Sequence, residues 1–267
     1  MRLALPLLVL SLAARPIAAQ SAAAHLAIGD SAHLARHPDQ ALQHYQAALA
    51  AEPANYAALW KAARSIADVA KQLTGTADSL KRRRDSLYTV GRDFAERAVR
   101  ADSLGADGHY ALAMVLGRLS RTKGSKERVR FAKIIYEEAA RAAALDSLHD
   151  GAHHVLGAWH AEVRRLSGVQ RFFAKTLFGG GFMSRAAWDS AVVHLRRAVA
   201  LRPQHIYHRL ELADVYIDLD RYTEARELLT SIAGLPVDDV MDPEYQREAV
   251  ARLTAIQGKR DRAARGS

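Results

Sequence analysis

Residues 29–53 read GDSAHLARHPDQALQHYQAALAAEP, and their pattern of small and large residues is the strongest indication of the fold. It carries small residues at a spacing at which two neighbouring helices can approach closely: Gly29, Ala41 and Ala48. Tyr45 is placed to fill the space beside them. Pro53 ends the second helix, because proline has no N–H for the hydrogen-bond ladder and its ring clashes with the preceding turn. The stretch therefore predicts two helices that pack against each other across a short turn.

The same ending recurs along the chain. Four copies stop at the dipeptides Glu52-Pro53, Asp102-Ser103, Asp146-Ser147 and Arg202-Pro203, and a fifth copy follows at Leu212, Ala213, Tyr216, Ala225 and Leu229. The pattern matches the tetratricopeptide repeat, a helix–turn–helix unit of about 34 residues. The four stops lie 50, 44 and 56 residues apart, so the middle units must contain additional residues.

We therefore predict an all-α fold of tetratricopeptide-like helix-turn-helix repeats stacked into a right-handed solenoid. The expected repeat domain covers 20–257, with units at about 22–55, 56–105, 106–149, 150–205 and 206–239. A capping helix is expected at 242–257, because Asp242 is a good N-cap and Pro243 is tolerated at the first helical position. Residues 258–267 should form a basic flexible tail. The alternative, an irregular helical bundle, does not explain five coincident endings.

Residues 1–19 have the layout of a secretory signal peptide. The segment has a basic start at Arg2, an apolar run over 3–14 and a small residue at Ala19. The run is shorter than the roughly 20 apolar residues that span a bilayer. We therefore expect cleavage near Ala19 and a soluble exported protein, periplasmic in a bacterium. The alternative is an uncleaved N-terminus that anchors the chain at a membrane.

The composition argues against several kinds of function. The absence of cysteine excludes disulfides, thiol catalysis, Cys-ligated zinc and iron–sulfur clusters. The sequence has no nucleophile elbow, P-loop or dinucleotide-binding motif, so we expect no enzyme, no catalytic residue, no cofactor and no metal. Basic residues gather at 81–84 and 118–133, but acids lie among them and no aromatic residues alternate with them, as single-strand binding requires. We therefore expect no nucleic-acid partner, whereas contact with an anionic membrane surface stays open.

One stretch is more specific than the repeat pattern. Residues 145–162 read LDSLHDGAHHVLGAWHAE, and RFFAKTLFG follows at 171–179. The chain resembles the regulator of microtubule dynamics family over about 22–257, most specifically over 145–230. The resemblance implies a helical-repeat domain without catalytic residues. It also implies, as an alternative function, a microtubule- or cytoskeleton-associated regulator, since the animal members are associated with microtubules, spindle poles and organelle contacts.

Candidate binding residues follow from the repeat register. Trp60, Tyr110 and His154 occupy equivalent positions on three consecutive first helices, and Arg64 and Asp214 stand one turn further along the same face. The first helices of stacked repeats line the concave surface. We therefore predict that these residues bind a peptide or protein partner through aromatic anchors and charged pairs, as in a scaffold or adaptor. The alternative is that they pack between helices.

The apolar segment 169–183 is an insert within the fourth unit. Phe172, Phe173, Leu177 and Phe178 give it an apolar helix, and three glycines follow at 179–181. It is interpreted either as a helix packed across the repeat or as a lid or partner-docking element. As a third alternative, it contacts a membrane surface, which would make the chain a lipid-associated protein.

Four histidines crowd residues 149–160. Imidazoles at helical spacing can bind zinc, and His153 and His160 share a helical face. No His-Glu-x-x-His motif accompanies them. We expect His149, His153, His154 and His160 to be packed or hydrogen-bonded, with a metal site as the alternative.

Overall fold

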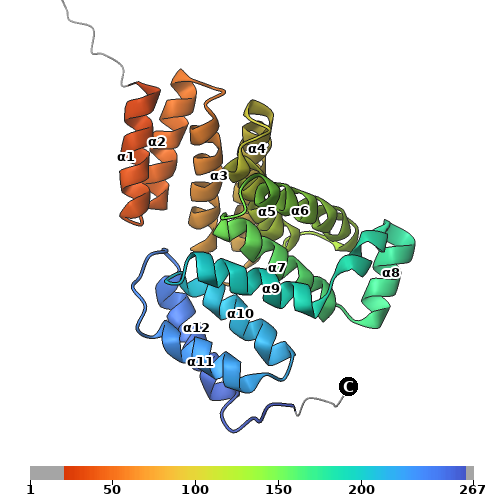
Figure 1. Cartoon of the computed structure of the whole chain (residues 1–267). Helices are drawn as coiled ribbons and strands as arrows, with labels where there is room; N and C mark the ends of the chain where they lie inside the picture. The colour runs from red at the N-terminus through yellow and green to blue at the C-terminus, as the bar shows by residue number, and fades with distance from the viewer. Residues whose placement is uncertain (1–20, 263–267) are drawn as a thin grey trace, which may run out of the picture.

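The computed structural model describes residues 21–262 and shows a curved stack of antiparallel helix pairs (Figure 1). The first three pairs are α1 (Ala22–Leu34) with α2 (Pro38–Ala51), α3 (Tyr56–Lys71) with α4 (Asp78–Ala101), and α5 (Ala106–Ser120) with α6 (Ser125–Leu145). The last two are α7 (Asp150–Arg165) with α9 (Trp188–Leu201), and α10 (Ile206–Asp218) with α11 (Tyr222–Ile232), followed by α12 (Asp242–Ala255). No strand occurs within 21–262. The predicted all-α helical-repeat fold is therefore confirmed.

The insert lies between α7 and α9 and forms two elements, α8 (Gly168–Phe178) and the 3₁₀ helix η1 (Gly180–Arg185). The other long units owe their length to their second helices: α4 has 24 residues and α6 has 21, against 14 for α2. The predicted signal peptide, 1–19, and the last residues of the predicted tail, 263–267, lie outside the described residues. None of the helices in the described part is long and apolar enough to cross a bilayer.

The second helices end at the stops read from the sequence. In the first four units the residue after the helix leaves the helical conformation while its N–H still bonds the carbonyl four residues back: Glu52, Asp102, Asp146 and Arg202. Where the stop lacks proline, the aspartate replaces it by accepting a hydrogen bond from the backbone N–H two residues on. Asp102 binds Leu104 in this way, and Asp146 binds Leu148, each at 2.9 Å. These Asx turns reverse the chain as the prolines do elsewhere.

Small residues let the paired helices approach closely. The alanines at the helix contacts are fully buried, among them Ala41, Ala48, Ala191 and Ala198. A methyl group at Gly29 would lie 2.5 Å from the Tyr45 ring, so glycine there makes room for the tyrosine predicted to fill the gap. A methyl group at Gly157 on α7 would lie 2.5 Å from Leu195 Cγ on α9. The predicted pattern of small and large residues thus specifies the contact of each helix pair.

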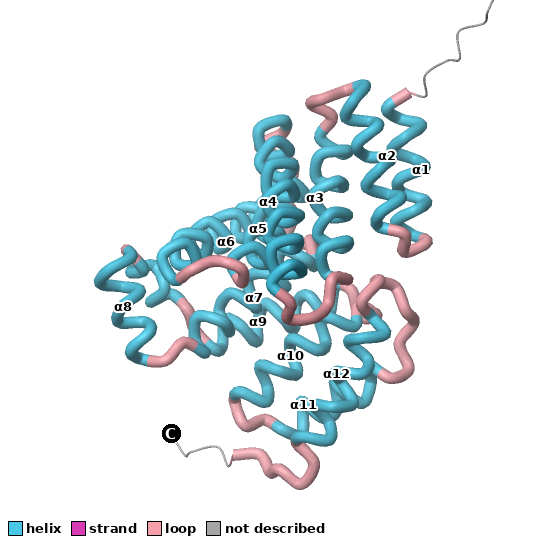
Figure 2. Tube along the Cα trace, turned by 180° about the vertical axis from the view of Figure 1, so that it is seen from behind, coloured by secondary structure: helices cyan, strands magenta, loops and turns pink. Residues whose placement is uncertain are grey.

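The two ends of the stack meet through the loop that precedes α12 (Figure 2). Arg36, after α1, donates a hydrogen bond of 3.1 Å to the carbonyl of Val237. Lys71, at the end of α3, lies 3.2 Å from a carboxylate oxygen of Asp239. These contacts join positions 201 and 168 residues apart. The loop therefore bridges the open side of the curve and partly encloses its concave surface.

Candidate functional site

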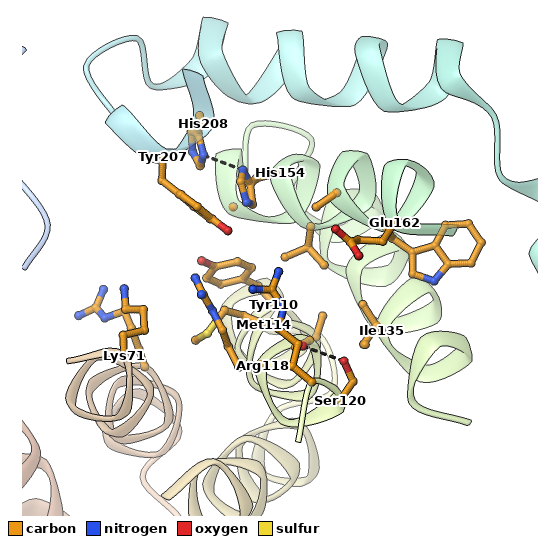
Figure 3. A pocket seen from close by; sticks show the side chains of 18 of the residues that line it. Lys71, Tyr110, Met114, Arg118, Ser120, Ile135, His154, Glu162, Tyr207 and His208 are labelled. Atoms are coloured by element: carbon orange, nitrogen blue, oxygen red, sulfur yellow. Dashed lines mark hydrogen bonds between the residues drawn. The ribbon is translucent and has the colours of Figure 1, made fainter. Parts of the chain in front are cut away.

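A cavity of about 920 Å³ occupies the concave side of the stack. Its walls come mainly from the first helices of the repeats, α3, α5, α7 and α10, with α6 and α8 at one end and the loop before α12 at the other. Figure 3 shows side chains of these helices pointing toward one another across it. Because the wall is built from one face of several consecutive helices, it places the same repeat positions side by side.

Four of the five predicted binding residues line this cavity: Trp60, Arg64, Tyr110 and His154. The Arg64 guanidinium lies over the Trp60 ring, 5.0 Å from its centroid, in cation–π geometry. Tyr110 is wedged against Gly151 at the start of α7, and its ring lies 4.6 Å from that of His149. Aromatic and cationic side chains thus face the cavity together.

Asp214 lies outside this cavity. Its carboxylate forms a bidentate pair with Arg252 on α12, at 2.5 and 3.0 Å. The start of α10 contributes Tyr207 and His208 to the cavity, but α12 packs against α10 and pairs with Asp214 further along the helix. Asp214 therefore holds the capping helix in place.

Sequence reasoning missed Arg118, which stands one further turn along the predicted row, after Tyr110 and Met114. Its guanidinium lies 5.4 Å from the centroid of the Tyr207 ring. Among the described residues no carboxylate lies within ion-pair distance of it. Figure 3 shows Arg118 and Lys71 on one side of the cavity, facing Tyr207, His154 and His208 on the other. Two helical turns after Tyr110 the same face reaches Arg118, and two turns after His154 it reaches Glu162. Following the face for two turns instead of one would have found both residues.

Lys71 is a different kind of cation. It lies 2.8 Å from Asp68 and 3.2 Å from Asp239, and only 12% of its side chain is exposed. Burial disfavours its charge, but the two carboxylates outweigh that effect and hold the pKa of Lys71 above its ordinary value. Lys71 is therefore already neutralised by the protein.

The histidines of α7 and α10 form a buried hydrogen-bonded chain. His208 Nε2 lies 2.8 Å from a carboxylate oxygen of Asp150, and its Nδ1 lies 3.1 Å from Nδ1 of His154. Since Nε2–H of His208 donates a hydrogen bond to the carboxylate, Nδ1 of a neutral His208 accepts the hydrogen bond that His154 donates. Burial keeps the pKa of His154 well below its ordinary value and lowers that of His205, stacked on His208, to about 3. These rings are therefore uncharged at neutral pH.

The remaining histidines of the cluster each have a separate partner. His149 Nδ1 accepts a hydrogen bond from the Ala152 N–H and so caps α7. His153 lies 3.1 Å from His194, and His160 accepts from the N–H of Ala187. Their ring nitrogens form hydrogen bonds within the protein. In the described part of the chain, no group of three His, Asp or Glu side chains is arranged to hold a metal ion.

The insert forms one end of the cavity. Helix α8 begins at Ser167 with a capping box formed with Gln170, and it ends at Gly179, whose φ of 69° favours glycine. Its buried Ala174 lines the cavity, while Phe172 points outward with 61% of its surface exposed. The side chains of the other predicted lid or membrane residues, Phe173, Leu177 and Phe178, lie outside the described residues.

Comparison with known proteins identifies the family of this chain. The family profile described as regulator of microtubule dynamics protein 1-3 matches residues 25–257. Regulator of microtubule dynamics protein 1 of Bos taurus is 27% identical over 202 residues, which cover 75% of this chain and 62% of the bovine protein. Protein 3 of Rattus norvegicus is 26% identical over 202 residues, which cover 75% of this chain and 41% of the rat protein. The chain thus spans less than two thirds of the length of these relatives.

Among solved structures, a thermophilic TPR protein of Thermus thermophilus has a TM-score of 0.61 and 18% identity, over 86% of this chain and 99% of that chain. At that identity the likeness shows the fold alone. The resemblance read from the 145–230 segment is confirmed by the profile match, which extends over nearly all of the described residues. The protein therefore belongs to the regulator of microtubule dynamics family and has its helical-repeat fold.

Proposed function

We propose that this protein is a non-catalytic, exported adaptor that holds a segment of a partner protein in its concave cavity. The observation that carries the proposal is the cavity itself: the first helices turn aromatic and cationic side chains into a space of about 920 Å³ rather than into a filled core. A cleft of this size, into which aromatic side chains and polar groups converge, is typical of a binding site.

The lining residues suit a protein segment. Trp60, Tyr110 and Tyr207 offer large flat surfaces at small cost in side-chain entropy, and arginines stand among them. Tyrosine, tryptophan and arginine are the residue types that contribute most binding energy in protein interfaces. The loop before α12 would then define the width of the opening through which the segment enters.

Photo-crosslinking from inside the cavity tests the binding site. A photoreactive amino acid at Met114, which lines the cavity, should capture the partner in cells that produce the protein. The same group at Val193, which is 64% exposed on α9 and lines no part of the cavity, is the matched control. Capture from Met114 alone supports the proposal. Capture from Val193 alone would place the partner on the outer surface instead.

Export is the second element of the proposal, and it is supported by the sequence of 1–19. The expected mature protein begins at Gln20 and is released with the soluble contents of the periplasm. Intact mass measures where the mature chain begins, and cell fractionation measures the compartment in which it is found. A chain that retains Met1 and sediments with membranes would favour the anchored form.

A second candidate function is regulation of microtubules, favoured by the profile match over 25–257 and by the names of the relatives. It would require a chain that stays in a compartment with microtubules. Co-sedimentation of the purified chain with polymerised tubulin tests it. Binding that saturates, together with an intact leader in the cytosol, would replace the exported adaptor by this function.

A further inference from the structure

We infer that the cavity is an anion-binding site centred on Arg118, and that its ligand is an acidic peptide segment whose carboxylate the guanidinium binds. The inference rests on the proposed function, because it takes the same cavity and names the chemistry of the segment that enters it.

The charges of the cavity wall are unevenly paired. The described wall carries seven acidic and seven basic side chains. Each acid already has a partner: Glu162 lies 2.9 Å from Arg165, Asp238 lies 2.6 Å from Arg202, and the others bind Lys71, a histidine or a backbone N–H. Within the described chain, by contrast, five lining arginines have no carboxylate partner: Arg36, Arg64, Arg118, Arg121 and Arg128. These guanidinium groups are therefore the places at which an acidic group of a ligand would be paired.

The surroundings of Arg118 orient its guanidinium and leave its charge unpaired. The guanidinium lies over the ring of Tyr207 and beside Tyr245. Burial raises the pKa of Tyr245 to about 12 and that of Tyr207 above its ordinary value, so both phenols are neutral at pH 7. They can orient the guanidinium without neutralising it. A planar guanidinium held in this way presents N–H groups that match a carboxylate in bidentate geometry.

The polarity of the cavity wall distinguishes a peptide from an acyl chain. Besides its charged side chains, the described wall includes five histidines: His33, His149, His154, His205 and His208. Polar and charged groups that a ligand removes from water are costly unless the ligand offers them hydrogen bonds. A peptide backbone supplies carbonyl and N–H groups along its length, whereas a hydrocarbon chain supplies neither. The wall therefore fits an acidic peptide better than a lipid tail.

The test uses two pools of random decapeptides. One pool carries Asp, Glu and a free C-terminal carboxylate; the other carries Asn, Gln and a C-terminal amide at the same positions. The full-length protein is immobilised as wild type, as Arg118→Gln and as Arg100→Gln. Within the described chain Arg100 is exposed on α4, does not line this cavity and forms no ion pair, so its substitution removes the same charge from a site without this role. Retained peptides are quantified by mass spectrometry.

We expect the wild type and Arg100→Gln to retain the acidic pool at least about tenfold better than the amide pool, as charge-assisted hydrogen bonds imply. Arg118→Gln should lose that preference. Arg118→Lys, which keeps the charge but not the bidentate geometry, should retain an intermediate preference and serves as the test if Arg118→Gln does not fold.

Three outcomes would overturn the inference. Equal retention of both pools would mean that the cavity binds peptides without distinguishing acidic from neutral ones, which leaves the proposed function intact. Retention of neither pool would contradict the inference and the proposed function together. Binding of phosphatidylglycerol vesicles that Arg118→Gln abolishes, with no peptide retained, would assign the cavity to lipid.

Discussion

A methyl group added at Gly157 tests whether close approach of α7 and α9 holds the fourth helix pair together. It would lie 2.5 Å from Cγ of Leu195, which is fully buried, and 3.1 Å from the carbonyl oxygen of Ala191. The leucine has no empty space to enter, and the carbonyl moves only if α9 moves. Overpacking of this kind costs about 1–3 kcal/mol, while replacing a helical glycine by alanine gains up to about 1 kcal/mol. We expect Gly157→Ala to lose about 1–2 kcal/mol of stability.

Gly117→Ala is the matched control. Gly117 also lies within a first helix, α5, but apart from the backbone of that helix no described atom lies within 4 Å of the position that its Cβ would take. Only the helix-propensity gain remains, so this variant should gain about 0.5–1 kcal/mol. For a chain of this size each kcal/mol shifts the thermal midpoint by roughly 2–4 °C. Circular dichroism melts of the two variants should therefore move in opposite directions. A Gly157→Ala protein at least as stable as Gly117→Ala would refute the close-approach argument.

Three further outcomes follow from the charges. Burial lowers the pKa of His205 to about 3 and that of His194 to about 4, so the unfolded chain takes up their protons first as the pH falls below about 6.5. Between pH 7 and pH 5 this should lower stability by about 2 kcal/mol for His205 and by less for His194, which is less deeply buried, seen as a lower urea midpoint. Lys71→Met leaves the buried carboxylate of Asp68 and the half-buried carboxylate of Asp239 without their cation and should lose about 3 kcal/mol, with faster proteolysis of the 235–241 loop. Lys81→Met, in an exposed pair, should change stability by less than about 0.5 kcal/mol. Asp214→Asn should weaken docking of α12, lowering the thermal midpoint by roughly 2–4 °C and increasing hydrogen exchange in α12 more than elsewhere.

Much of the fold was predictable from the sequence because its rules are local. The stops at Pro53 and Pro203 end helices through the chemistry of proline itself, and Asp102 and Asp146 do so through an Asx turn within three residues. Small residues at Ala41 and its counterparts recur with the period of the repeat. Such signals do not depend on contacts with distant parts of the chain.

The site was predictable in part, and the limit has a physical cause. The row that begins at Trp60, Tyr110 and His154 follows from the repeat register, and these residues do line one cavity. The pairing of Lys71 with Asp239 joins residues 168 apart, so it depends on the curvature that accumulates over the whole stack. The same holds for Asp214, which the capping helix covers. The local periodicity of the sequence does not predict how far the stack curves, so it cannot predict these distant contacts.

A crystal structure of the protein bound to an acidic peptide selected by the wild type would locate the binding site. We expect the peptide in the cavity between α3, α5, α7 and α10, with a carboxylate oxygen about 3 Å from the guanidinium of Arg118. A peptide bound on the outer surface, with none in the cavity, would contradict both the proposed function and the role of Arg118.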